Sequence, residues 1–188
     1  MPRIFNGVDA LEGEVPWRVY VRVAMKALCG GTIIHKNWVL TTAHCVERLE
    51  EGHEDDDSIY IRAGSISKWV GGQEIIVNGI AAKKHENFMN RDGLLWNDAA
   101  LIEVPDPGFN FTNPNIRPMC TASTTHNICP GDTGGSVDHR DDRGRYYAIG
   151  ISSYGMGDCG NPEDIRLLTR VAMFLDWIEK NTGEKFCT

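Results

Sequence analysis

The stretch RVYVRVAM, residues 18–25, decides the fold class because its side chains alternate strictly between two kinds. Valines occupy every second position from Val19 to Val23, and arginine or tyrosine occupies the positions between them. An alternation with a period of two is typical of a β-strand that buries one face and exposes the other. The stretch therefore predicts a half-buried strand.

Further short β-type runs follow along the chain, separated by clusters of Gly, Asn, Asp and Pro that are typical of turns. They are GGTIIHKNWVLTT (30–42), SIYIRAG (58–64), QEIIVNGIAA (73–82), AALIEV (99–104), GSVDHR (135–140), YYAIGISSY (146–154) and RLLTRV (166–171). Many short strands with regular turns predict an all-β barrel or sandwich. The tail VAMFLDWIEKNTG (171–183) differs, because its large apolar residues recur at helical spacing and Gly183 can end a helix.

Length and composition limit the classes of protein. At 188 residues and 41% hydrophobic, the chain can bury one sizeable core, so we expect one compact unit. The net charge of -7 leaves no basic stripe for nucleic acid or an anionic membrane, and no apolar run is long enough to span a bilayer. Six cysteines without a C-x-x-C motif favour disulfides and an oxidising compartment. The N-terminus MPRIF lacks a secretory h-region, so either the chain is cytosolic or its leader is absent from this sequence.

Three side chains have the chemistry that a hydroxyl nucleophile requires. Thr133 offers the hydroxyl, His44 follows a predicted strand and offers a base, and Asp98 precedes an apolar run and offers an orienting carboxylate. In PGDTGGS (130–136) the glycines allow a sharp turn whose amides can point together at one oxyanion. Each residue alone also fits a structural role, as a surface histidine, a turn-capping aspartate or part of an ordinary glycine-rich loop.

The order and context of these residues resemble the trypsin-like (chymotrypsin-fold) serine proteases. The blocks similar to the activation site, first strand, histidine block and aspartate block of that family are RIFNG (3–7), VPWRVYV (15–21), CGGTIIHKNWVLTTAHC (29–45) and NDAALIEV (97–104). Those similar to its nucleophile block, its substrate-binding strand, and its last strand and helix are CPGDTGGSV (129–137), AIGISSYGMGDCG (148–160) and LLTRVAMFLDWI (167–178). The resemblance runs from about residue 3 to 178 and implies a chymotrypsin-like double β-barrel with a C-terminal helix.

The resemblance implies a role for each candidate residue. His44 is the general base, Asp98 orients it, and Thr133 stands where the family has its nucleophilic serine. The amides of Gly131 and Thr133 form the oxyanion hole. The implied substrate-binding residues are Asn127, Ser153, Tyr154, Gly155 and Arg166.

Activation and disulfide bonding are implied in the same way. Cleavage between Arg3 and Ile4 frees an amine that pairs with Asp132 and orders the oxyanion loop. The cysteine pairs that the resemblance implies are Cys29 with Cys45 and Cys129 with Cys159, which leaves Cys120 and Cys187 to pair with each other.

The sequence departs from the family at the nucleophile and in the second barrel. Threonine adds a methyl group beside the hydroxyl of Thr133, which restricts its rotamers and fills space where His44 and the scissile carbonyl approach. Asp98 lies 54 positions after His44, but Thr133 lies only 35 positions after Asp98, so about half the strands of the second barrel have no counterpart. We expect a truncated second barrel. A skipped exon or an incorrect gene model is an alternative explanation of the gap.

A third departure concerns the specificity pocket. Asn127 stands at the pocket base, where trypsin-type members carry an aspartate, so selection for Lys or Arg is not supported. Arg166 stands where most members have a pocket-lining glycine. Its guanidinium either blocks the pocket, favours an acidic side chain or turns to solvent after a changed loop.

These observations predict a trypsin-like peptidase domain over residues 4–178. Its expected parts are a first barrel (4–105), a linker (106–128), a remnant of the second barrel (129–171) and a terminal helix (172–182). The predicted function is peptide-bond hydrolysis through an acyl-enzyme, impaired by Thr133 and the missing strands. The alternative is a catalytically inactive homologue that acts as a binding or regulatory module.

The expected setting follows from the same resemblance. We expect a secreted monomer with protein or peptide substrates and protease inhibitors as partners, without nucleic acid, membrane, cofactor or metal. A zinc protein is a further alternative, although the spacing of the residues concerned is not that of a structural site. Those residues are Cys29, His35, His44 and Cys45.

Overall fold

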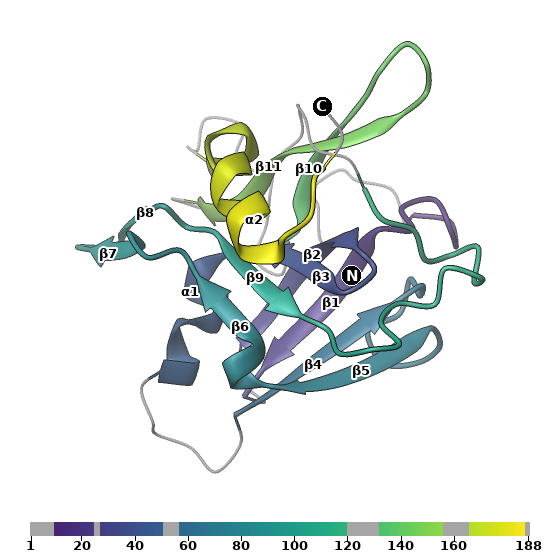
Figure 1. Cartoon of the computed structure of the whole chain (residues 1–188), viewed down its shortest axis with the longest axis horizontal. Helices are drawn as coiled ribbons and strands as arrows, with labels where there is room; N and C mark the ends of the chain where they lie inside the picture. Colours follow the sequence, from purple (N-terminus) through teal and green to yellow (C-terminus); the bar gives the residue numbers. More distant parts are fainter. Residues whose placement is uncertain (1–9, 25–26, 51–56, 120–131, 156–165, 187–188) are drawn as a thin grey trace.

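The computed structural model describes residues 10–24, 27–50, 57–119, 132–155 and 166–186. Most regular structure in these residues is β-strand, joined by short turns and accompanied by two α-helices (Figure 1). The all-β class predicted from the sequence is confirmed.

Seven antiparallel strands form the larger sheet. In spatial order they are β5 (Gln73–Asn78), β4 (Ser58–Ala63), β1 (Arg18–Val23), β2 (Ala27–His35), β3 (Trp38–Thr41), β9 (Ala100–Glu103) and β6 (Ala82–Lys84). The two edge strands, β5 and β6, are joined by the single 3-10 turn Gly79–Ala81. The sheet must therefore curl until its edges come together at this turn, which makes it the first barrel (Figure 1).

The interior of this barrel explains the alternation in β1. Val19, Val21 and Val23 are at most 1% exposed and belong to the main hydrophobic cluster. Val21 pairs with Ile61 of β4, which is also fully buried. Burying an aliphatic side chain of this size contributes roughly 1.5–3 kcal/mol to stability. The alternating valines of the sequence therefore form the inner face of the barrel at β1.

The second sheet has three described strands, β10 (Ser136–Arg140), β11 (Tyr146–Gly155) and β12 (Arg166–Arg170), in the spatial order β10-β11-β12. Both pairings are antiparallel, and each contains one irregularity of register. The predicted truncation of the second barrel is confirmed: the fold is a chymotrypsin-like double barrel in which the second barrel is incomplete.

The β10–β11 hairpin projects from the body of the molecule (Figure 1). Its turn is held by Asp141, whose Oδ2 accepts hydrogen bonds from Arg145 Nε at 2.8 Å and from Tyr147 Oη at 3.1 Å. Desolvation alone would raise the pKa of Asp141, but the hydrogen bonds from Arg145 and Tyr147 outweigh it and lower that pKa.

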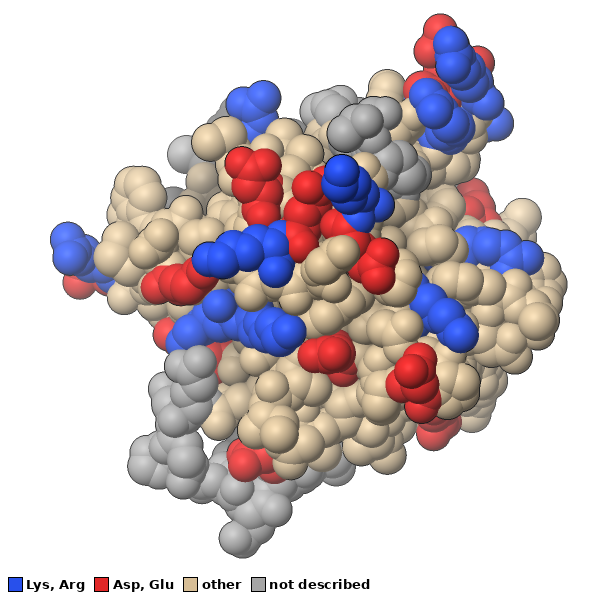
Figure 2. Space-filling view, in the orientation of Figure 1, with Lys and Arg blue, Asp and Glu red and all other residues tan. Residues whose placement is uncertain are grey.

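On the face of the molecule seen in Figure 2, acidic and basic side chains are interspersed rather than gathered in a stripe of one sign.

The C-terminal helix joins the two sheets. Helix α2 spans Leu175–Thr182 and follows a 3-10 turn at Val171–Met173, so it begins later than the predicted residue 172. Its buried Ile178 belongs to a hydrophobic cluster that also contains Leu101 of the barrel and Ile151 of the second sheet. The helix therefore stabilises the arrangement of both sheets around the site.

Two short elements near the site were not expected from the sequence. Helix α1 (Ala43–Val46) is a single turn that continues into a 3-10 turn at Glu47–Glu50. Strands β7 (Met89–Arg91) and β8 (Leu94–Trp96) form a small hairpin that ends just before Asp98. Both turn residues of the hairpin, Asp92 and Gly93, have positive φ. The Asp-Gly dipeptide is the signal that predicts such a hairpin.

Candidate active site

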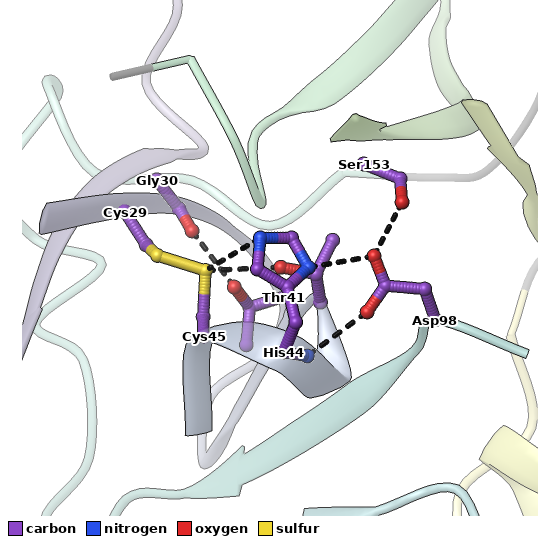
Figure 3. The surroundings of a disulfide bond; sticks show 8 residues. Cys29, Gly30, Thr41, His44, Cys45, Asp98 and Ser153 are labelled. Atoms are coloured by element: carbon purple, nitrogen blue, oxygen red, sulfur yellow. Dashed lines mark hydrogen bonds and ion pairs between the residues drawn. A yellow bond between two sulfur atoms is a disulfide. The ribbon is translucent and has the colours of Figure 1, made fainter. Parts of the chain in front are cut away.

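His44 and Asp98 reach the same edge of the first barrel from two neighbouring strands. His44 lies on α1, directly after β3, and Asp98 lies directly before β9, which pairs with β3. His44 Nδ1 lies 2.7 Å from Asp98 Oδ2, and the His44 backbone N–H donates to Asp98 Oδ1 at 2.9 Å (Figure 3). The structure thus brings together the base and the carboxylate that the sequence predicts.

Asp98 is only 2% exposed, and its burial is matched by hydrogen bonds. Besides its two bonds to His44, its Oδ2 accepts the hydroxyl of Ser153, and its backbone carbonyl accepts the hydroxyl of Thr169 at 2.8 Å. A buried carboxylate needs such donors in place of water. Because a carboxylate oxygen only accepts, the His44 proton belongs on Nδ1, which leaves Nε2 able to take a proton.

The side chain of Ser153 has a position that sequence reasoning missed. The residue was expected to line the substrate-binding strand, but its hydroxyl points at Asp98 (Figure 3). The neighbouring Tyr154 is 37% exposed. Gly155, the last residue of β11, pairs with Arg166, the first residue of β12. The serine lies in a run of buried residues, and nothing in the sequence of that run indicates which buried group it contacts.

The disulfide between Cys29 and Cys45 is present, as the resemblance implies. It lies beside the imidazole, since Cys45 Sγ is 4.0 Å from His44 Nε2 (Figure 3). The alternative of a zinc site is wrong, because sulfurs joined in a disulfide are not the thiolates that zinc binds. Within the described ranges, no group of three or more His, Cys, Asp or Glu side chains could hold a metal ion.

The Thr133 loop lies between the first barrel and the second sheet. The carbonyl of Thr133 accepts the Gly30 N–H at 2.6 Å, and the Gly134 N–H donates to the carbonyl of Ser152 at 2.7 Å. Gly30 in turn receives the Thr41 hydroxyl at 2.9 Å on its carbonyl. These contacts set the loop against β2, which carries Cys29, and against β11 of the second sheet.

The hydroxyl of Thr133 is not joined to the imidazole. Among the hydrogen bonds of the described residues, none links Thr133 Oγ1 to His44, whose ring contacts Asp98 and the Cys45 sulfur. The loop is therefore in the neighbourhood of the histidine–carboxylate pair without completing a hydrogen-bonded triad. Asp132, next to Thr133, accepts the Gly135 N–H at 3.0 Å on its carbonyl.

Hydrogen bonds from Trp17 and Arg18 hold the start of β10. Arg18 Nη2 donates to the Ser136 carbonyl at 2.8 Å and to Asp138 Oδ2 at 3.2 Å. The Trp17 indole N–H donates to the same carboxylate oxygen at 3.1 Å. These bonds tie β1 to the strand that follows the Thr133 loop, and they fix one end of that loop.

Gly134 is the residue on which the loop's shape depends. Its φ is 85°, and a Cβ at this position would collide with the Gly30 carbonyl and the Thr41 hydroxyl. A non-glycine residue at positive φ costs roughly 1–3 kcal/mol, and this cost applies at Gly93 as well. We expect Gly134→Ala to lower the free energy of unfolding by more than Gly93→Ala does, because at Gly134 the Cβ also collides with two neighbouring atoms. The matched control is Gly93→Ala, where φ is 79° and no atom lies within 4 Å. Urea unfolding that gives equal losses for both variants would contradict the importance of the contact.

Several predicted site residues lie outside the described residues, so their expected roles stay predictions. They are Arg3, Ile4, Cys120, Asn127, Cys129, Gly131, Cys159 and Cys187. The side chain of Arg166 is likewise not described, although its backbone belongs to β12. The oxyanion hole, the activation pair and two of the implied disulfides therefore have no structural test.

The barrel, the incomplete second barrel and the histidine–carboxylate pair define a protein of the chymotrypsin-fold protease class. The family model for trypsin matches residues 4–126 and 114–178, which together make up most of the chain. The chain therefore belongs to the trypsin family. The two matched stretches overlap at residues 114–126, between Asp98 and Thr133, where the sequence is shorter than the family pattern.

Curated relatives agree with this membership. The chain is 27% identical to vitamin K-dependent protein C of Mus musculus over 248 aligned residues, covering 98% of this chain and 53% of that protein. It is 24% identical to transmembrane protease serine 9 of Rattus norvegicus, covering 95% of this chain and 22% of that protein. The chain thus spans about half the length of the protein C relatives. No helix in the described ranges is long and apolar enough to cross a membrane.

A solved structure shares the fold. The structure titled HL collagenase superposes with a TM-score of 0.73 at 21% identity, over 97% of this chain and all of that one. This similarity supports the chymotrypsin-like architecture.

Proposed function

We propose that the chain is a serine-type endopeptidase domain whose hydrolysis of peptide bonds is strongly impaired. His44 acts as the general base, Asp98 orients it, and Thr133 is the attacking alcohol of the acyl-enzyme mechanism. The observation that carries the proposal is the fully formed His44–Asp98 pair beside a loop whose alcohol is a threonine. The His44–Asp98 pair supports base catalysis, whereas the threonine at the nucleophile position limits the rate of attack.

The limitation has a steric cause. The methyl group of Thr133 shares the Cβ with the hydroxyl, so the rotamer that aims Oγ1 at His44 Nε2 also places a methyl group near the incoming carbonyl. Nucleophilic attack depends on a near-attack geometry, and a misplacement of about 1 Å costs on the order of a hundredfold in rate. The incomplete second barrel adds to this, because it supplies fewer strands to hold the loop.

Thr133→Ser tests the proposal directly. The protein is prepared with Ile4 as its first residue, and its labelling by a fluorophosphonate probe is compared with that of the serine variant. We expect Thr133→Ser to raise the labelling rate at least about tenfold, and up to on the order of a hundredfold, because it removes the methyl group and keeps the hydroxyl. Thr133→Val is the matched control, since it keeps the shape and removes the nucleophile.

Two results decide the matter. Labelling of the parent as fast as the serine variant would show that the threonine does not impair the site. Labelling of Thr133→Val at the serine variant's rate would show that the probe reacts elsewhere. If neither parent nor serine variant reacts, the incomplete second barrel is the cause, and the second candidate function applies.

The second candidate is an inactive homologue that acts as a binding or regulatory module. The short second sheet favours this second function. Catalysis needs the nucleophile loop to be held accurately, whereas the surface around the His44–Asp98 pair can bind a partner without a complete catalytic site. Binding of a protein protease inhibitor by Thr133→Val, measured by calorimetry, is the expected sign of this function. Protein or peptide substrates and inhibitors are the proposed partners, and a monomer is the proposed state.

We also propose that the domain works outside the cell and is activated by cleavage after Arg3. The Cys29–Cys45 disulfide supports an oxidising compartment, since cytosolic thiols are kept reduced. Treating intact cells and the culture medium with a thiol-alkylating reagent distinguishes an extracellular protein, whose two cysteines are joined, from a cytosolic one, whose cysteines are free to react. Protein recovered with both cysteines alkylated would contradict the extracellular proposal.

A further inference from the structure

Residues Asn110, Phe111 and Thr112 form an Asn-x-Thr triplet, and the full sequence contains no other Asn-x-Ser or Asn-x-Thr triplet with a residue other than proline in the middle. This pattern is the acceptor for N-linked glycans on surface loops of secreted proteins. The residue after the triplet is Asn113, so no proline stiffens the acceptor from that side. The triplet has no part in the proposed catalysis.

The packing of the two neighbouring phenylalanines turns Asn110 outward. Phe109 is 1% exposed, and Phe111 packs against the main hydrophobic cluster of the first barrel. Asn110 lies between them and is exposed, as is Thr112. A glycan on Asn110 therefore extends into solvent without displacing any core side chain.

The side chain of Asn110 folds back on the third residue of the triplet in a tight turn. Its Oδ1 accepts the Thr112 N–H at 3.0 Å and the Thr112 hydroxyl at 2.7 Å. Both bonds are made by the carbonyl side of the amide, so Nδ2 points the other way. The hydrogen bonds of the described residues include none that uses this Nδ2.

The backbone of this turn is held by the barrel. The Asn110 N–H donates to Gln73 Oε1 at 2.8 Å, and Gln73 Nε2 donates to the Gly108 carbonyl at 3.0 Å. Gln73 opens strand β5, so the turn is fixed to the first barrel and not to the second sheet. The incomplete second barrel therefore does not affect the acceptor.

The acceptor lies at the other end of the barrel from the His44–Asp98 pair. Asp98 precedes strand β9, whereas Asn110 follows it, so the strand separates them. In Figure 1 the chain that leaves β9 runs along the right of the molecule, and α1 with His44 lies on the left. A glycan at Asn110 thus leaves the catalytic pair accessible.

We propose that Asn110 is a site of N-linked glycosylation. The donor class is an oligosaccharide joined to a polyisoprenyl lipid through a diphosphate. Asn110 Nδ2 forms a bond to C1 of the first sugar, the bond between C1 and the diphosphate oxygen breaks, the lipid diphosphate leaves with the electron pair, and Nδ2 loses one proton. The inference rests on the proposed extracellular setting, because this transfer takes place on chains that enter the secretory pathway.

The test is made on the full chain carrying a heterologous secretory leader, expressed in animal cells, so that its own route of export does not affect the result. We expect peptide N-glycosidase F to shift the gel mobility of the secreted parent, and mass spectrometry to find Asn110 converted to Asp in the peptide of residues 92–117. Thr112→Ser is expected to keep the shift. Asn110→Gln and Thr112→Ala are expected to lose it completely.

Asn113→Gln is the matched control, because Asn113 forms a similar turn, accepting the Asn115 N–H at 3.0 Å, but starts no triplet. It should behave as the parent does. A secreted parent with the Cys29–Cys45 bond formed and Asn110 unmodified would overturn the inference. That outcome leaves the fluorophosphonate result unchanged, so failure of the glycosylation site and failure of the proposed catalysis are distinguishable.

Discussion

Asp98→Ala is expected to lower the free energy of unfolding by about 3–5 kcal/mol, the usual cost of removing one partner from a buried charged network. The carboxylate accepts three hydrogen bonds, from the His44 backbone, the His44 ring and the Ser153 hydroxyl. Alanine leaves these donors without an acceptor in a place that water reaches poorly. Urea unfolding followed by tryptophan fluorescence measures the loss.

The matched control for this variant is Asp142→Ala, because Asp142 is an exposed residue in the β10–β11 turn. Its replacement should change stability by less than about 0.5 kcal/mol, as is usual for surface positions. A loss below about 1 kcal/mol for Asp98→Ala is the scale of one ordinary hydrogen bond. It would mean that the three hydrogen bonds to the Asp98 carboxylate are not all formed in solution.

Asp98→Asn separates the structural role from the chemical one. The amide oxygen still accepts the His44 backbone N–H, so the stability loss should be smaller than for alanine. The amide nitrogen then faces the imidazole as a donor, which forces the ring proton from Nδ1 to Nε2. In a Thr133→Ser background this variant should remain folded and lose probe labelling, because a protonated Nε2 cannot act as a base.

The fold was predictable because several signals agreed in each segment. The valine alternation at Val19–Val23 gave the inner face of the barrel, and Gly183 gave the end of the last helix. The curling of the sheet was not predictable from local pattern, since it depends on the turn Gly79–Ala81 joining its two edge strands. Closure of the barrel depends on how strands far apart in the sequence pair with one another. The periodicity of residues within one strand carries no information about this pairing.

The site was predictable in its parts and only partly in its contacts. His44 and Asp98 stand at the ends of neighbouring strands, so their meeting follows from the fold that the resemblance implies. The contact of Ser153 with Asp98 depends on which way one side chain of β11 points, and β11 has an irregular register between Ser152 and Tyr154. An irregularity of that kind reverses the expected face, and the sequence gives no sign of it.

These contacts explain why the His44–Asp98 pair stays formed although the second barrel is incomplete. Most of what holds the pair belongs to the first barrel: strands β3 and β9, helix α1 and the disulfide. Among the described residues of the second sheet, Ser153 and Thr169 bond to Asp98. Ile151 of the same sheet packs with helix α2 and the barrel, which keeps this sheet near the pair. The nucleophile loop, by contrast, lies between the two sheets, so truncation should affect Thr133 before it affects His44.

Removing the Cys29–Cys45 disulfide is the second change with a large expected effect. The bond joins residues 16 positions apart and is buried at Cys45, which is 1% exposed. A cross-link closing a loop of about this length contributes about 3 kcal/mol by restricting the unfolded chain. We therefore expect the double variant Cys29→Ala, Cys45→Ala to melt roughly 6–12 °C below the parent, since 1 kcal/mol corresponds to about 2–4 °C at this chain length.

Thr42→Val is the matched control for the cross-link, because it removes the hydroxyl that lies 3.0 Å from Cys45 Sγ and leaves the disulfide in place. Its melting temperature should fall by no more than about 4 °C, in line with the loss of one hydrogen bond. A double variant that melts within about 2 °C of the parent would contradict the expected contribution of the cross-link. A large fall confined to the double variant instead assigns the stability to the covalent bond and not to the Thr42 hydroxyl beside it.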